Sequence, residues 1–325
     1  MANSKFNYCY YINIHIVWRF KSFYFNRQSP IFYSDNLIII SAYYLFSLNL
    51  KYISFETVQT NSSHLLSSKY IPNYTAGLTF FIAVAATNLF HQGNWQRVFA
   101  AKNNEVLKKS LLFSFIIIIP IVFFMGISGI IAISIDSKVN PDLAFFSILL
   151  QDKTEFLSIL IIILAVSLTV STIDTLVNAI SSIVVVDGKK VYSKPKQKNF
   201  LGLSKVFIVI LSVISLIIAS KGYSILYLFL LADLLCCAGV FTVFYGFYKE
   251  KFQEKNAIFS ILLGLFLGLL FFPSPDFSKS ILVGILVPYD LFPQIILSSL
   301  LFWSFLLATV VPAIVIMSYD SFKRR

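Results

Sequence analysis

The chain has 325 residues, of which 58% are hydrophobic and 13% are charged. Soluble globular domains contain about 25% charged residues, so this composition excludes a water-soluble fold, which needs a polar shell around its core. The net charge is +11, from 26 Lys and Arg against 15 Asp and Glu. We interpret this excess as cationic cytoplasmic loops and expect no nucleic-acid partner. The apolar runs are continuous and about twice the ten-residue length of β-barrel strands, which predicts an all-α polytopic membrane protein.

Eight apolar stretches predict transmembrane helices, because each approaches or exceeds the ~20 residues that cross a bilayer. They are residues 37–55, 77–97, 110–134, 157–185, 203–220, 223–247, 257–273 and 293–318. Residues 281–288 are too short to span and predict an interfacial or re-entrant piece. The predicted organisation is therefore a cytoplasmic segment (1–36), a transmembrane bundle (37–318) and a basic cytoplasmic tail (319–325).

The distribution of basic residues predicts the orientation of this bundle. With the N-terminus inside, 20 of the 26 Lys and Arg residues fall in cytoplasmic segments and six fall outside. Membrane proteins carry this excess on their cytoplasmic side. We therefore expect a multi-pass protein of the cell membrane with both termini in the cytoplasm.

Polar side chains enter the inner half of the span 77–97. One face of this half carries Asn88, His91, Gln92, Trp95 and Gln96. Gly93 allows local unwinding or close packing there. Trp95 and Arg97 fit the membrane interface, where an indole ring and a snorkelling guanidinium are common. Asn88 and His91 lie one or two turns deeper, so the interface accounts for them less well.

The span 157–185 carries a polar stripe. Its members recur at intervals of three and four residues: Ser167, Ser171, Asp174, Asn178 and Ser181. Hydroxyl groups often join helices to one another, and that alternative stays open for the serines. A carboxylate near mid-membrane costs at least ~2.5 kcal/mol, so Asp174 is expected to face a cavity, a partner or an ion.

A second intramembrane acid, Asp233, lies near the middle of the span 223–247. A functional role and a purely structural pairing are both open for it. Lys51, Arg97 and Lys205 lie near the ends of their predicted spans, so no intramembrane Lys or Arg is expected to pair with it. The carboxyl group must therefore meet hydroxyls, amides, water or a bound cation, or be protonated.

No enzyme motif is present. The chain has no His-Glu-x-x-His sequence, no Walker loop and no nucleophile elbow, and its three histidines are far apart. A helical bundle with inward polar stripes is instead typical of a solute path. We therefore expect a transporter rather than an enzyme.

Several segments resemble the sodium:solute symporter family. Asn94 to Lys102 is similar to the family's Gln-Arg-x-x-Ala-Ala-Lys signature at the inner end of the sixth core helix. Val170 to Ser182, followed by Asp187, is similar to its eighth core helix. Ser34-Asp35 resembles a Thr-Asp pair that opens the fifth core helix, and Leu231 to Leu235 resembles the tenth in one subgroup.

The resemblance implies a LeuT-like fold and sodium-driven symport of a small polar solute such as urea, an amino acid, a sugar or a carboxylate. It implies a Na⁺ site formed by the hydroxyls of Ser171 and Thr172 and the carbonyl of Leu168, with no organic cofactor and no other metal. Asp35 and Asp174 would lie on the ion pathway. The residues implied to line the solute cavity are Asn88, His91, Gln92 and Asp233.

The resemblance covers residues 33–318 and does not include the family's first four core helices, which supply the other half of the sodium site. Three interpretations follow: a truncated product without transport, half of a split transporter, or a fragment of a longer symporter. As an alternative function, such a chain would bind membrane partners or sense a solute. Its polar stripes would face lipid if it were alone, which predicts instability or assembly with a chain that supplies the missing helices.

Overall fold

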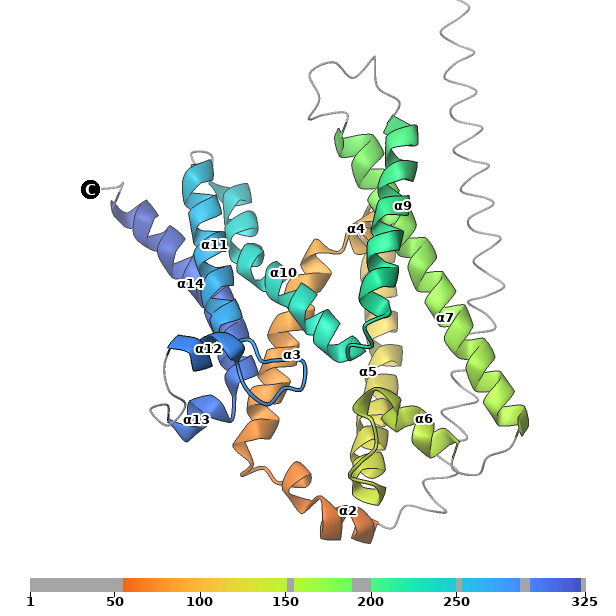
Figure 1. Cartoon of the computed structure of the whole chain (residues 1–325). Coiled ribbons are helices and arrows are strands. Elements are labelled where there is room, and N and C mark those ends of the chain that lie inside the picture. The colour runs from red at the N-terminus through yellow and green to blue at the C-terminus, as the bar shows by residue number, and fades with distance from the viewer. Residues whose placement is uncertain (1–54, 151–154, 189–199, 250–252, 287–292, 323–325) are drawn as a thin grey trace, which may run out of the picture. The chain divides into compact units, whose positions relative to one another are not determined.

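The computed structural model describes residues 55–150, 155–188, 200–249, 253–286 and 293–322. Within these ranges the secondary structure is helical and includes no strand (Figure 1). Six of these helices are long and apolar enough to cross a membrane. The prediction of an all-α polytopic membrane protein is therefore confirmed.

The six candidate spans lie close to six of the predicted ones. They belong to α5 (Asn104–Ile135), α7 (Glu155–Ser182) with the π-helical turn η3 (Ile183–Asp187), α9 (Phe200–Ala219), α10 (Ile225–Tyr248), α11 (Glu254–Phe271) and α14 (Leu300–Phe322). The predicted span 37–55 lies, except for Phe55, outside the described residues. The predicted span 77–97 is divided between two helices, α3 (Ile71–Phe90) and α4 (Gln92–Phe99).

The chain forms two compact units. The first contains α2 (Phe55–Asn61), α6 (Ala144–Leu149) and most of α5 and α7. Val58 of α2, Ile131 and Ala132 of α5 and Ala144 of α6 are buried in its core. The Asn61 side-chain amide donates a hydrogen bond of 2.9 Å to the Ser134 carbonyl, which joins α2 to the end of α5.

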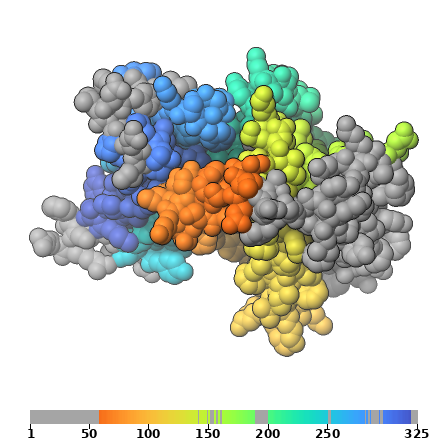
Figure 2. Space-filling view, turned by 90° about the horizontal axis from the view of Figure 1, so that it is seen from below, coloured from red at the N-terminus to blue at the C-terminus, as the bar shows by residue number. Residues whose placement is uncertain are grey.

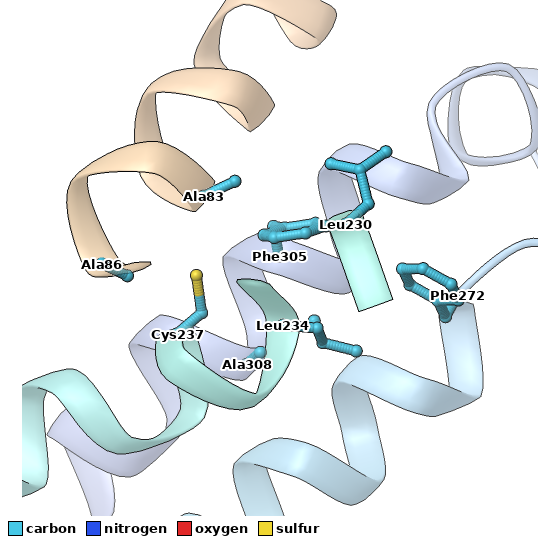
Figure 3. Packing of buried hydrophobic residues seen from close by; sticks show 8 residues of the cluster. All are labelled: Ala83, Ala86, Leu230, Leu234, Cys237, Phe272, Phe305 and Ala308. Atoms are coloured by element: carbon cyan, nitrogen blue, oxygen red, sulfur yellow. The ribbon is translucent and has the colours of Figure 1, made fainter. Parts of the chain in front are cut away.

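The second unit contains α3, α4, the start of α5, and the chain from Asn178 onward. Its centre is a bundle of α3, α10, α11 and α14. Eight buried hydrophobic residues pack together in this bundle (Figure 3): Ala83, Ala86, Leu230, Leu234, Cys237, Phe272, Phe305 and Ala308. Phe272 directly follows α11, and the other seven lie within α3, α10 and α14.

Small residues let α11 and α14 approach closely. A Cβ atom added at Gly264 would lie 2.4 Å from Cγ of Pro312, and one at Gly268 would lie 2.9 Å from Cβ of Ala308. Glycines four residues apart form such a contact face because they lie on one side of a helix. The Ser304 hydroxyl also donates a hydrogen bond of 2.6 Å to the Gly268 carbonyl.

The connection between α11 and α14 contains two short helices, α12 (Ile281–Leu286) and α13 (Gln294–Leu297). Six residues of helix rise only about 9 Å, so α12 does not span. The helix is thus too short to span, as expected, and an interfacial or re-entrant placement of residues 281–288 stays a prediction. The Ser280 hydroxyl donates a hydrogen bond of 2.5 Å to the Leu270 carbonyl and ties the connection back to α11.

Other long helices present apolar side chains at the surface. α5 exposes Leu111, Phe113 and Phe123, and its side chains are visible in yellow in Figure 2. α9 exposes Val209 and Leu216 in the same way. Helices that are apolar on their exposed faces are suited to hydrocarbon rather than water.

Candidate functional site

The polar half of the predicted span 77–97 is a broken helix. α3 ends at Phe90, and His91 has an extended backbone (φ −72°, ψ 102°) before α4 begins at Gln92. Asn and His side chains near this point compete for backbone hydrogen bonds and weaken a continuous helix. The sequence indicated that Gly93 allows local unwinding, and the break lies two residues before it.

Side chains satisfy backbone groups that the break releases. The Trp95 indole N–H donates a hydrogen bond of 2.7 Å to the Leu89 carbonyl, one of the last carbonyls of α3, which lack partners within the helix. The Asn94 amide donates to Asn88 Oδ1 at 2.9 Å. Trp95 therefore holds the junction, a role that the sequence did not reveal.

The predicted solute residues at this junction have different surroundings. Asn88 is exposed and donates to the Val84 carbonyl at 2.8 Å. His91 and Gln92 are half-buried. The Nδ1 atom of His91 is buried and has no hydrogen-bond partner among the described residues. These three residues therefore lie at one helix break, and the His91 Nδ1 atom is the polar ring atom there that no described residue satisfies.

Asp233 lies in the bundle core, 7% exposed, on α10. The Thr87 hydroxyl of α3 donates a hydrogen bond of 2.6 Å to its Oδ1 atom. A hydroxyl group was among the partners expected from the sequence, but Thr87 itself was not singled out. Thr87 follows the buried Ala83 and Ala86 at helical spacing, so the small-residue face of α3 was the signal that could have identified it.

The helices that pack around Asp233 contain few charged residues. Asp233 is the single charged residue of α10, and α3 contains none. α11 has Glu254 and Lys255 in its first turn, and α14 has Asp320 near its end. The basic residue of these four helices, Lys255, therefore lies at the start of α11, whereas Asp233 lies in the middle part of α10. Such a group is stable when it is protonated or when it meets a cation.

The residues implied to bind sodium lie on α7. The Thr172 hydroxyl donates a hydrogen bond of 2.9 Å to the Leu168 carbonyl, and the Thr175 hydroxyl donates one of 3.0 Å to the Ser171 carbonyl. Leu168, Ser171 and Thr172 are exposed. Two of the three implied ligand oxygens, the Leu168 carbonyl and the Thr172 hydroxyl, are therefore adjacent on one helix face, and the hydroxyl oxygen keeps its lone pairs while it donates its proton.

Of the two acids assigned to the ion pathway, one lies among the described residues. Asp174 is exposed on α7, two residues beyond Thr172, whereas Asp35 lies outside the described residues. Among the residues that the structure describes, no group of three His, Cys, Asp or Glu is placed to hold a metal ion. An oxygen site for Na⁺ on α7 would instead consist of hydroxyl and carbonyl groups.

Comparison with known proteins gives one distant relative. The chain is 25% identical over 226 residues to the spermidine transporter DUR31 of Candida albicans. The similarity covers 66% of this chain and 42% of that protein, so the chain spans less than half of the relative's length. Neither a protein-family model nor a solved structure matches the chain.

Proposed function

We propose that this multi-pass membrane protein takes part in secondary active transport, in which a small polar solute crosses the cell membrane together with Na⁺. The observation that carries the proposal is the 226-residue similarity to a membrane transporter. The geometry agrees with it, since the broken helix at His91 and the buried Asp233 place polar groups where a bundle that only anchors would be apolar. No enzymatic step is included in this proposal.

The sodium:solute symporter resemblance supplies the coupling ion. Thr172 Oγ1 and the Leu168 carbonyl oxygen are 2.9 Å apart. A hydroxyl that donates its proton to a carbonyl still presents lone pairs to a cation, and hard oxygen ligands suit Na⁺. We propose that these two groups and the Ser171 hydroxyl form one side of the site, in a LeuT-like arrangement.

The solute proposed from the sequence is a urea, amino acid, sugar or carboxylate, bound near Asn88, His91 and Gln92. The relative adds spermidine, a polyamine that is cationic at neutral pH. An amine would suit Asp233, which has a hydroxyl donor and no basic neighbour on its own helix or on α3. An amine-bearing solute therefore belongs among the candidates.

A second candidate follows from the length of the relative. Since the chain spans 42% of that protein, the relative's whole activity need not reside in the aligned part. In this alternative the chain binds a membrane partner that supplies further helices, or senses a solute, and transports nothing by itself.

Uptake into proteoliposomes separates these proposals. The chain is reconstituted alone, a Na⁺ or K⁺ gradient is imposed, and uptake of radiolabelled spermidine, urea, proline, glucose and a monocarboxylate is measured. Uptake that requires Na⁺ supports symport. Uptake equal in Na⁺ and K⁺ contradicts the sodium coupling, and no uptake of any solute by folded protein favours the partner-binding alternative.

A further inference from the structure

The segment that joins α3 to α5 combines aromatic and basic side chains. α4 carries Trp95 and Phe99 one turn apart, with their ring centroids 6.3 Å from each other. Phe99 is 82% exposed. Exposed aromatic rings next to apolar helices are typical of the headgroup level of a bilayer, so the apolar side of this segment is suited to lipid.

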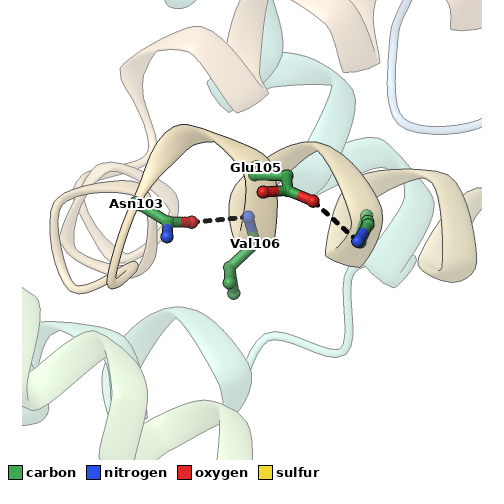
Figure 4. A network of polar contacts seen from close by, with 4 residues as sticks. Asn103, Glu105 and Val106 are labelled. Carbon is green, nitrogen blue, oxygen red and sulfur yellow. Dashed lines mark hydrogen bonds and ion pairs between the residues drawn. The ribbon is translucent and has the colours of Figure 1, made fainter.

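The charge of the segment is strongly positive. Residues 92–112 contain four basic side chains, Arg97, Lys102, Lys108 and Lys109, against the single acid Glu105, which gives 4 − 1 = +3. Glu105 is already engaged, because its carboxylate accepts a hydrogen bond of 2.8 Å from the Lys109 ammonium (Figure 4). Glu105 is the one acid of this segment, so Lys102 and Lys108 add positive charge to it without a second acid in the segment.

The local fold fixes where these charges lie. Asn103 Oδ1 accepts a hydrogen bond of 2.8 Å from the Val106 amide and caps the start of α5 (Figure 4). Lys102 directly precedes this cap, and Lys108 follows within about 8 Å along the helix axis. Both side chains are exposed. The aromatic pair of α4 and the basic start of α5 are thus neighbours in the chain, separated by residues 100–103.

We propose that residues 95–109 form a docking surface for anionic lipid headgroups. The aromatic rings enter the boundary of the leaflet, and the ammonium groups of Lys102 and Lys108 contact phosphate or carboxylate oxygens. Complementary charge selects an anionic lipid over a zwitterionic one, and each basic residue near such a surface strengthens binding roughly fivefold. The inference is independent of the transported solute and of sodium coupling.

Trp95 provides the test, because brominated acyl chains quench an indole that touches them. The full chain with Trp18→Phe and Trp303→Phe is reconstituted in phosphatidylcholine bilayers that contain increasing amounts of brominated phosphatidylglycerol or brominated phosphatidylcholine. We expect stronger quenching by the anionic lipid, with a preference of roughly 25-fold if two lysines contribute. The preference should decrease as salt is added, because salt screens exposed charges.

Matched variants locate the surface. Lys102→Gln with Lys108→Gln should remove most of the preference, whereas Lys69→Gln with Lys221→Gln, which removes the same charge from other exposed positions, should leave it. Equal quenching by the two lipids in the unchanged segment would overturn the proposal. So would a preference that both double variants share, or binding of an acidic peptide, but not of the anionic lipid, that depends on Lys102 and Lys108.

Discussion

Helices α11 and α14 approach closely at Gly264, and substitution there tests the packing of these two helices. In Gly264→Ala the new Cβ would lie 2.4 Å from Cγ and 2.7 Å from Cδ of Pro312, and 3.0 Å from the Ala308 carbonyl oxygen. An ordinary contact is about 1 Å longer, and neither a proline ring nor a helical carbonyl can turn away. The two helices must therefore separate.

The magnitude follows from two opposing effects. Overpacking of a tight core costs about 1–3 kcal/mol, and replacing Gly by Ala in a helix returns about 1 kcal/mol. We expect a net loss of up to about 2 kcal/mol in the free energy of unfolding. Gly77→Ala on α3 is the matched control, because no atom lies within 4 Å of its added Cβ, and it should be neutral or slightly stabilising.

The assay is unfolding of the purified chain in mixed micelles, followed by circular dichroism. A double-mutant cycle with Pro312→Ala separates the clash from other effects. In that background Gly264→Ala should cost less than half as much, since the ring is gone. If Gly264→Ala were as stable as Gly77→Ala, or if its cost were unchanged by Pro312→Ala, the close approach of α11 and α14 would be refuted.

Two further predictions concern hydrogen bonds. Thr87→Val should lower the free energy of unfolding by about 1–2 kcal/mol, because it leaves the buried Asp233 without its hydroxyl donor. Asp233→Asn should lower it by less, since the amide oxygen of Asn can still accept the hydrogen bond from Thr87. Equal stability of Thr87→Val and the wild type in mixed micelles would contradict this role. Trp95→Phe should speed hydrogen exchange of the α4 amides about 2–10-fold by removing the donor to Leu89. Trp303→Phe is its control. It should leave the exchange rates of the α4 amides unchanged, because the Trp303 indole N–H is buried without a hydrogen-bond partner among the described residues.

The sequence predicted the helices better than their contacts. Continuous apolar runs located α9 and α10 within a few residues, since hydrocarbon thickness dictates helix length. The break at His91 was less predictable, because polar residues near an interface are compatible with either a continuous or an interrupted helix. Gly93 indicated unwinding in the correct region without locating it.

The partner of Asp233 required the structure. The expectation that the carboxyl meets a polar group followed from the cost of burying it, but the donor, Thr87, is 146 residues away in the chain. Local patterns cannot specify such a pairing. On α7, by contrast, the proximity of Leu168 and Thr172 follows from their spacing of four residues, because such residues are neighbours on a helix.

The most direct test of the central claim is the sodium dependence of uptake by the reconstituted chain, comparing the wild type with Ser171→Ala combined with Thr172→Ala. We expect Na⁺-driven uptake of at least one solute in the panel, and a weakened response to Na⁺ in the double variant at an unchanged amount of folded protein. A Na⁺ response that survives the loss of both hydroxyls, or wild-type uptake that is indifferent to Na⁺, would contradict it.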